Sequence, residues 1–217
     1  MHQSREEKQV VIQSQPQLQQ GVNLLCKLGK LPVFQSLFSK ELDGRNATAV
    51  WIDSKNESST YALSSFGSPT IMEKVHIGRA FTPFQHHRLI HQLEEFVQEN
   101  TELLVLPNID FLYLDGQVKD WEAEELFQEA WQKILEVKEE YGLKVLASLS
   151  SRNSSLSYAV IGDSHNKIQV EATQAGWRYD SEDFEQYAYR DGREVQTTVP
   201  YWHQKTSETV KVSAEAV

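Results

Sequence analysis

A glycine, a glutamine and a serine follow a predicted strand where a phosphate-binding loop would hold them. Residues 22–28 are predicted as the first core strand, and Gly29, Gln35 and Ser36 lie between this strand and a predicted helix. The loop pattern G-x-x-x-x-G-K-[S/T] uses its second glycine to let backbone amides approach the phosphates and its lysine to neutralise them. Aligned on Gly29 and Ser36, the pattern places Phe34 at the second glycine and Gln35 at the lysine. The sequence thus predicts a nucleotide pocket without its two main phosphate contacts.

A second alignment takes Gly29 and Lys30 as the glycine–lysine pair of the same loop. It then places Leu24 at the first glycine, inside the strand, and Leu31 at the hydroxyl position. The first alignment respects the boundary between strand and helix, so we prefer it. Neither alignment gives a competent loop.

A second candidate position for nucleotide chemistry follows the apolar run at residues 103–106. A short apolar run between helix-like stretches is typical of a strand buried on both faces of a parallel sheet. In nucleotide-binding proteins with this kind of sheet, such a strand usually ends in an aspartate that reaches a magnesium ion. Here the next residue is Pro107, which has neither a carboxylate nor a backbone N–H. The nearest acid is Asp110, three residues further, which is about 10 Å along an extended strand.

Three aspartates are predicted near the ends of core strands. Asp53 follows the apolar run at residues 47–52, and Asp110 and Asp115 follow the run at residues 103–106. They could surround a residual pocket, because functional loops lie at the carboxyl ends of parallel strands. Aspartates also cap helices and turns, and we favour that interpretation here.

The sequence predicts one domain of alternating strands and helices between two polar ends. We expect a flexible N-terminal arm at 1–20, one domain at 21–202 and a polar tail at 203–217. Helices are predicted from Thr82, with Pro83 and Gln85 completing the start signal, and from Asp120 as a cap. Further strands are predicted at 144–149, 158–161 and 167–172, followed by a hairpin at 184–202.

Four stretches resemble segments of the RecA/RadA recombinase superfamily, in particular its archaeal RadA- and RadB-like branch. They are residues 50–54 (Val-Trp-Ile-Asp-Ser), 75–82 (Val-His-Ile-Gly-Arg-Ala-Phe-Thr), 103–110 (Leu-Leu-Val-Leu-Pro-Asn-Ile-Asp) and 144–150. Their order and spacing, rather than any one motif, carry the resemblance over residues 20–170. It implies an α/β fold: a RecA-like, mostly parallel central sheet with helices on both faces and a C-terminal antiparallel extension.

The positions at which the chain departs from that family are those that carry out the family's chemistry. The family's water-activating carboxylate corresponds to Lys55, which cannot act as a base while it is protonated. Glu57 could replace that carboxylate only if the loop shifts its register. The family's polar sensor positions hold Leu149 and Ser150. With Pro107 at the metal position, the resemblance implies a protein that has lost ATPase activity and uses neither ATP nor magnesium as a cofactor.

The predicted function is therefore protein binding by an inactive RecA-like domain, with a RecA/RadA-type recombinase as the partner and DNA repair or recombination as the setting. One alternative is a weak, DNA-linked ATPase that uses ATP and magnesium through Ser36, Glu57 and Asp110. Others are a single-stranded DNA-binding accessory protein and a SulA-like division inhibitor.

A polar loop is the candidate DNA or partner contact. It contains Ser150, Ser151, Arg152 and Asn153, whose side chains suit phosphate contacts. The chain has a formal net charge of -10, which opposes phosphate binding. We therefore expect at most weak contact with DNA.

Other side chains are predicted to be structural. His86, His87 and His91 lie on one predicted helix, but the sequence shows no third metal ligand, so we expect a hydrogen-bonded helix face and no metal. The one cysteine, Cys26, excludes an internal disulfide. No apolar stretch approaches the length of a membrane span, and we expect a cytoplasmic location.

Overall fold

The computed structural model describes residues 18–27, 34, 37, 41–42, 45–56, 58, 69–182, 184–191, 194–197 and 201–202. Predicted positions outside these residues are Gly29, Gln35, Ser36 and Glu57, together with the tail at 203–217 and residues 1–17 of the expected arm.

The fold is α/β, with a mostly parallel sheet that carries antiparallel strands at its C-terminal end, as the sequence predicts. Its strands are β1 (Gly21–Lys27), β2 (Thr48–Asp53), β3 (Val75–Arg79), β4 (Thr101–Leu106), β5 (Lys144–Ser148), β6 (Asn166–Ala172), β7 (Gly176–Asp180), β8 (Phe184–Asp191), β9 (Glu194–Thr197) and β10 (Tyr201–Trp202). The described helices are α3 (Pro83–His91), α4 (Asp120–Tyr141) and α5 (Ser155–Gly162), with 3₁₀ turns η1 (Pro69–Lys74), η2 (Leu93–Glu95) and η3 (Phe111–Tyr113).

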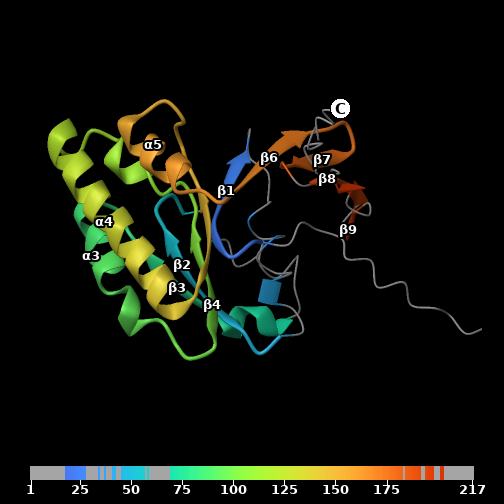
Figure 1. Cartoon of the computed structure of the whole chain (residues 1–217), viewed down its shortest axis with the longest axis horizontal. Helices are drawn as coiled ribbons and strands as arrows, with labels where there is room; N and C mark the ends of the chain where they lie inside the picture. Colours follow the sequence, from blue (N-terminus) through green and yellow to red (C-terminus); the bar gives the residue numbers. More distant parts are fainter. Residues whose placement is uncertain are drawn as a thin grey trace, which may run out of the picture.

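The strands follow the order β3-β2-β4-β5-β1-β6-β7-β8, and both β9 and β10 pair with β8. The strands from β3 across to β6 run parallel to their neighbours. From β7 onward the pairing is antiparallel. Strand β6 therefore joins the parallel part of the sheet to the antiparallel part (Figure 1).

Side chains alternate between the two faces of the sheet, and each face has its own apolar core. On one, the Trp51 face, Trp51 packs with the buried helical residues Phe34, Leu37 and Leu42. On the other, the α4 face, Val50 and its neighbours pack against α3, α4 and α5. Figure 1 shows these three helices together on one side of the sheet. Both faces are covered, which explains why the strands form apolar runs in the sequence.

Two helix boundaries test the predicted start signals. Thr82 caps α3 as predicted: its hydroxyl accepts a hydrogen bond from Gln85 N at 3.2 Å, and Pro83 is the first helical residue. The prediction that Asp120 caps α4 is wrong, because Lys119 is the cap residue and Asp120 lies in the first turn. An acid there still favours the helix through its dipole. No helix in the described part of the chain has the length and apolarity to span a membrane.

The strand predicted at residues 158–161 is wrong, because these residues belong to helix α5. Ser154 and Ser157 form a reciprocal capping box: each side chain accepts from the other residue's backbone N–H, at 3.2 Å in both cases. This cap begins a helix within what the sequence presents as a polar loop. Residues 158–161 form a short apolar run, a pattern that fits a buried helix as well as a strand.

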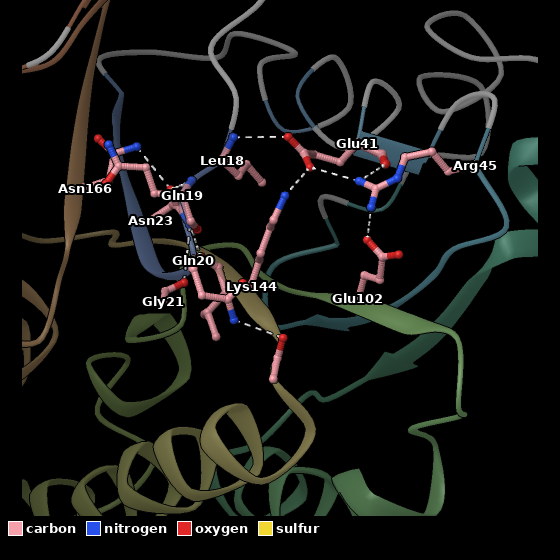
Figure 2. A network of polar contacts seen from close by, with 12 residues as sticks. Leu18, Gln19, Gln20, Gly21, Asn23, Glu41, Arg45, Glu102, Lys144 and Asn166 are labelled. Atoms are coloured by element: carbon pink, nitrogen blue, oxygen red, sulfur yellow. Dashed lines mark hydrogen bonds and ion pairs between the residues drawn. The ribbon is translucent and has the colours of Figure 1, made fainter.

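A polar network joins distant segments at the end of the sheet where the parallel strands begin, here called the amino edge (Figure 2). The carboxylate of Glu41 accepts from Leu18 N at 3.1 Å and from Lys144 Nζ at 2.9 Å. Arg45 lies beside it, with Nη1 3.8 Å from Glu41 Oε2, and also pairs with Glu102. The network holds Leu18, the third-last residue of the expected arm, against the sheet.

Asn23 is the buried centre of the same network (Figure 2). Its amide nitrogen donates to the carbonyls of Gln19 at 2.8 Å and Val145 at 3.2 Å. Its oxygen accepts from Gln19 N at 2.8 Å and from the Asn166 amide at 3.1 Å. One side chain on β1 thus bonds to the chain before it, to β5 and to β6.

Candidate functional site

The candidate site is a cavity at the opposite end of the sheet, where the parallel strands end, here called the carboxyl edge. Residue Ile71, between β2 and β3, packs on the Trp51 face, whereas α4, which follows β4, packs on the α4 face. The chain therefore leaves β2 and β4 toward opposite faces, and these two strands are neighbours in the sheet. Such a divergence opens a crevice in which α/β proteins bind ligands.

This carboxyl-edge cavity has a volume of about 320 Å³. Its walls come from residues 53–56 at the end of β2, residues 79–81 at the end of β3, and Phe111, Leu112, Asp115 and Gln117 after β4. Of the predicted pocket residues, Asp53 and Asp115 therefore meet here, whereas Asp110 does not line this cavity.

Asp53 is buried and holds the loop that follows β2. Its carboxylate accepts from Lys55 N at 3.2 Å, from Ser58 N at 3.0 Å and from the Ser58 hydroxyl. Arg79 Nε lies 3.7 Å away, and the same guanidinium donates to Ser58 O at 3.0 Å. Asp53 and Arg79 are register partners in the β2–β3 pair, so the sheet itself places the two charges together. The carboxylate is thus engaged by the loop and by a cation.

The base of the cavity combines a cation, an aromatic ring and a buried hydroxyl. The Lys55 ammonium lies 4.5 Å from the centre of the Phe111 ring, which is a favourable cation–π geometry. Ser54 is buried, and its Oγ has no hydrogen-bond partner in the described part of the chain. A buried hydroxyl is normally paired, so Ser54 is one of the exceptions among the described residues.

The rim of the cavity is aromatic and exposed. Phe81 has 68% of its surface exposed. Gln117 fixes the neighbouring loop, because its Nε2 donates to Asp115 Oδ2 at 2.6 Å and approaches Phe81 O at 3.5 Å. Sequence analysis did not select Arg79, Phe81 or Gln117. Arg79 could have been found as the last residue of a strand parallel to the one that ends in Asp53.

Asp110 holds the loop after β5. Its carboxylate is fully buried and accepts from Ser150 N at 2.6 Å and Ser151 N at 2.9 Å. Nearby, Asn108 N donates to Ser148 Oγ at 2.9 Å. Two predicted sites, Asp110 and the Ser150–Ser151 part of the polar loop, are therefore adjacent. Their contact joins the carboxyl ends of β4 and β5, which are neighbours in the sheet.

The rest of the predicted loop is exposed. Arg152 approaches Gln169 Oε1 at 3.5 Å, and Asn153 N donates to Ser151 Oγ at 3.4 Å. Burial raises the pKa of the Cys26 thiol, although the nearby charges of Arg152 and Lys167 act in the opposite direction. The thiol is therefore not activated as a nucleophile.

Phe34, which the alignment placed at the second glycine of the phosphate loop, belongs to the core. Its side chain is buried, and its ring centre lies 6.2 Å from that of Trp51. A core phenylalanine at this position packs the segment after β1 onto the sheet, whereas the loop pattern needs a glycine open to phosphate.

The three histidines of α3 have different environments. His86 is buried, and its Nδ1 lies 2.8 Å from the Tyr113 hydroxyl. Burial, with a smaller effect of His87, lowers the pKa of His86 to about 3. His87 and His91 point instead toward α4, where Glu129 lies 2.8 Å from His87 Nε2. Glu129 is the third potential ligand that the sequence did not show.

A scan against protein-family models found no match for this chain, and a search of curated proteins found none either.

Proposed function

We propose that this chain is a RecA-like domain without ATPase activity that acts by binding another protein at the carboxyl-edge cavity. The observation that carries the proposal is that the carboxylates of Asp53 and Asp110 are both occupied by contacts within the chain. Both acids lie after core strands, and both are engaged in holding loops, with Asp53 also paired to Arg79.

Phosphoryl transfer needs a phosphate cradle, a metal ligand and a positioned water. Phe34 packs in the core, Pro107 is buried directly after β4, and Lys55 rests on an aromatic ring. These three positions are the ones at which the resemblance implies a glycine, a metal-binding aspartate and a water-activating acid. Their environments support loss of the reaction. The mixed sheet with its antiparallel C-terminal strands supports the RecA-like assignment.

The cavity suits a protein partner. Its walls offer Phe81, Phe111 and Leu112 for apolar contact, and Lys55 and Arg79 supply positive charge beside them. Aromatic and arginine side chains around a pocket are typical of the centre of protein interfaces. A partner would insert an apolar side chain between these groups. The candidate partner is a RecA/RadA-type recombinase.

The first test is a calorimetric titration of the chain with ATP, with and without magnesium. We expect no binding at millimolar nucleotide, because the carboxylates are engaged and the loop pattern lacks its lysine. Micromolar, magnesium-dependent binding would refute the loss of ATPase chemistry.

The second test measures binding of the immobilised chain to the purified recombinase of the same organism. The wild type and Trp121→Ser should bind equally, because Trp121 is similarly exposed, at 62%, but does not line the cavity. Phe81→Ser should reduce affinity by about tenfold or more, as expected for an aromatic anchor. Equal binding by Phe81→Ser, or no binding by the wild type, would contradict the proposed site or partner.

A further inference from the structure

A cluster of potential metal ligands lies between α3 and α4, away from the carboxyl-edge cavity. It consists of His87 and His91 on α3 and Glu129 on α4, whose donor atoms all lie within 4.8 Å of one another. The two helices pack side by side, as Figure 1 shows. The cluster thus combines two ligands of one helix with one ligand 42 residues from His87 along the chain.

The geometry within the cluster follows from helix periodicity and helix packing. His87 and His91 are separated by one helical turn, and their ring centres lie 4.3 Å apart. Glu129 Oε2 lies 2.8 Å from His87 Nε2, and the next residue, Ala130, is buried beneath it. Because α4 is anchored by its buried stripe, the carboxylate is held opposite the two imidazoles.

The surroundings favour a cation. The cluster borders an open cavity of about 760 Å³ that is lined by His91, Gln128, Glu129, Gln132, Lys133 and Glu136. Lys133 is the nearby positive charge, and its ammonium pairs with Glu94 in η2, which follows α3. That pairing partly neutralises the one cation of the lining, while Glu136 adds a second carboxylate.

We propose that His87, His91 and Glu129 bind a divalent transition metal, with Zn²⁺ as the expected ion. Imidazole nitrogen and carboxylate oxygen are standard zinc ligands. Tetrahedral ligands around zinc are separated by about 3.3 Å, so donor atoms up to 4.8 Å apart need to close by at most about 1.5 Å, while the His87–Glu129 pair, at 2.8 Å, needs to open slightly. His91 and Glu129 are exposed, so side-chain rotation can supply this movement. A fourth position remains for water or for a ligand from another molecule.

The competing interpretation is a simple hydrogen bond between His87 and Glu129 with His91 as a neighbour. The two interpretations differ in what each residue contributes. A metal site depends on all three side chains, whereas a hydrogen-bonded pair gives no affinity for Zn²⁺ and no role to His91.

The test is calorimetric titration of the full chain, freed of any histidine tag, with Zn²⁺. We expect one site with micromolar or tighter affinity, and a rise in thermal unfolding temperature on adding the metal. His91→Ala and Glu129→Gln should each weaken binding by at least about tenfold, because each removes one of three ligands. Circular dichroism of each variant verifies that it is folded, as surface substitutions on helices should be.

Two matched variants serve as controls. Glu125→Gln removes an exposed carboxylate one turn earlier on α4, and His76→Ala removes a histidine on β3, outside the cluster. Both should bind Zn²⁺ as the wild type does. The proposal fails if the wild type does not bind Zn²⁺, or if His91→Ala and Glu129→Gln bind it with unchanged affinity.

Discussion

Polar side chains hold segments together at both ends of the parallel sheet, and a cavity remains beside them at the carboxyl edge. At the amino edge, Asn23 and Glu41 are each surrounded by partners from several segments of the chain. At the carboxyl edge, Asp53 and Asp110 also hold loops, but a cavity remains beside Asp53, with an exposed phenylalanine and a buried hydroxyl that has no partner among the described residues. The amino edge is therefore a structural junction, and the carboxyl edge keeps room for a ligand.

This comparison predicts that the largest loss of stability comes from the amino edge. Asn23→Ala removes donors and acceptors that serve Gln19, Val145 and Asn166, and it leaves buried groups unpaired. We expect the free energy of unfolding to fall by about 3 kcal/mol, measured by urea denaturation. Gln20→Ala is the control, because Gln20 is exposed and its side chain makes one bond, to Gly142 O at 3.0 Å. A loss below about 1 kcal/mol for Asn23→Ala would contradict the structural role.

A smaller loss is expected from Asp110→Asn at the carboxyl edge. The asparagine amide keeps one oxygen that can accept a hydrogen bond. Its NH₂ group replaces the second carboxylate oxygen and then faces a backbone N–H, so that two donors meet. The expected cost is about 2 kcal/mol, with faster tryptic cleavage at Arg152 because the loop is no longer held. Asp115→Asn, at an exposed position, should change neither quantity. If Asp110→Asn leaves both unchanged, Asp110 is free for another role, such as metal binding.

The smallest effect is a pH dependence that arises near the carboxyl edge. The pKa of His86 falls from 6.5 to about 3 on folding, so the unfolded chain binds more protons between these values. Stability from this group is therefore present above pH 6.5 and is lost as the pH falls toward 3. Between pH 7 and pH 5.5 the loss should be about 1.3 kcal/mol.

His86→Gln keeps a hydrogen-bonding group near Tyr113 but does not titrate. Its urea denaturation should show about 1.3 kcal/mol less pH dependence than the wild type over the same interval. An identical pH dependence in both proteins would show that His86 is not the group responsible.

The core strands and the start of α3 were predictable because their causes are local or periodic. Burial on both faces makes β2 and β4 continuous apolar runs, and the Thr82 cap depends on residues within one turn. The short apolar run at 158–161 was misassigned because its length does not distinguish helix from strand. The deciding contact was the Ser154–Ser157 cap, which the sequence presents only as part of a serine-rich loop.

The candidate site was predictable only in part, since it depends on which strands are neighbours. Asp53, Asp110 and Asp115 were candidates for a pocket because of their positions at or after the ends of core strands, although capping was the favoured interpretation. The engagement of Asp110 by Ser150 and Ser151 requires knowing that β4 lies beside β5, a tertiary fact. Glu129 was missed for the same reason, because only the packing of α4 on α3 brings it to His87.

The position of β6 has a consequence for how the chain folds during synthesis. Strand β1 is the first described strand to be made, yet one of its two edges stays unpaired until β6 emerges. Until then that edge offers free N–H and C=O groups to any other extended chain. A fragment that ends before Asn166 would keep this exposed edge permanently, so we expect it to aggregate. The parallel part of the sheet is thus complete only once β6, its last strand, has been made.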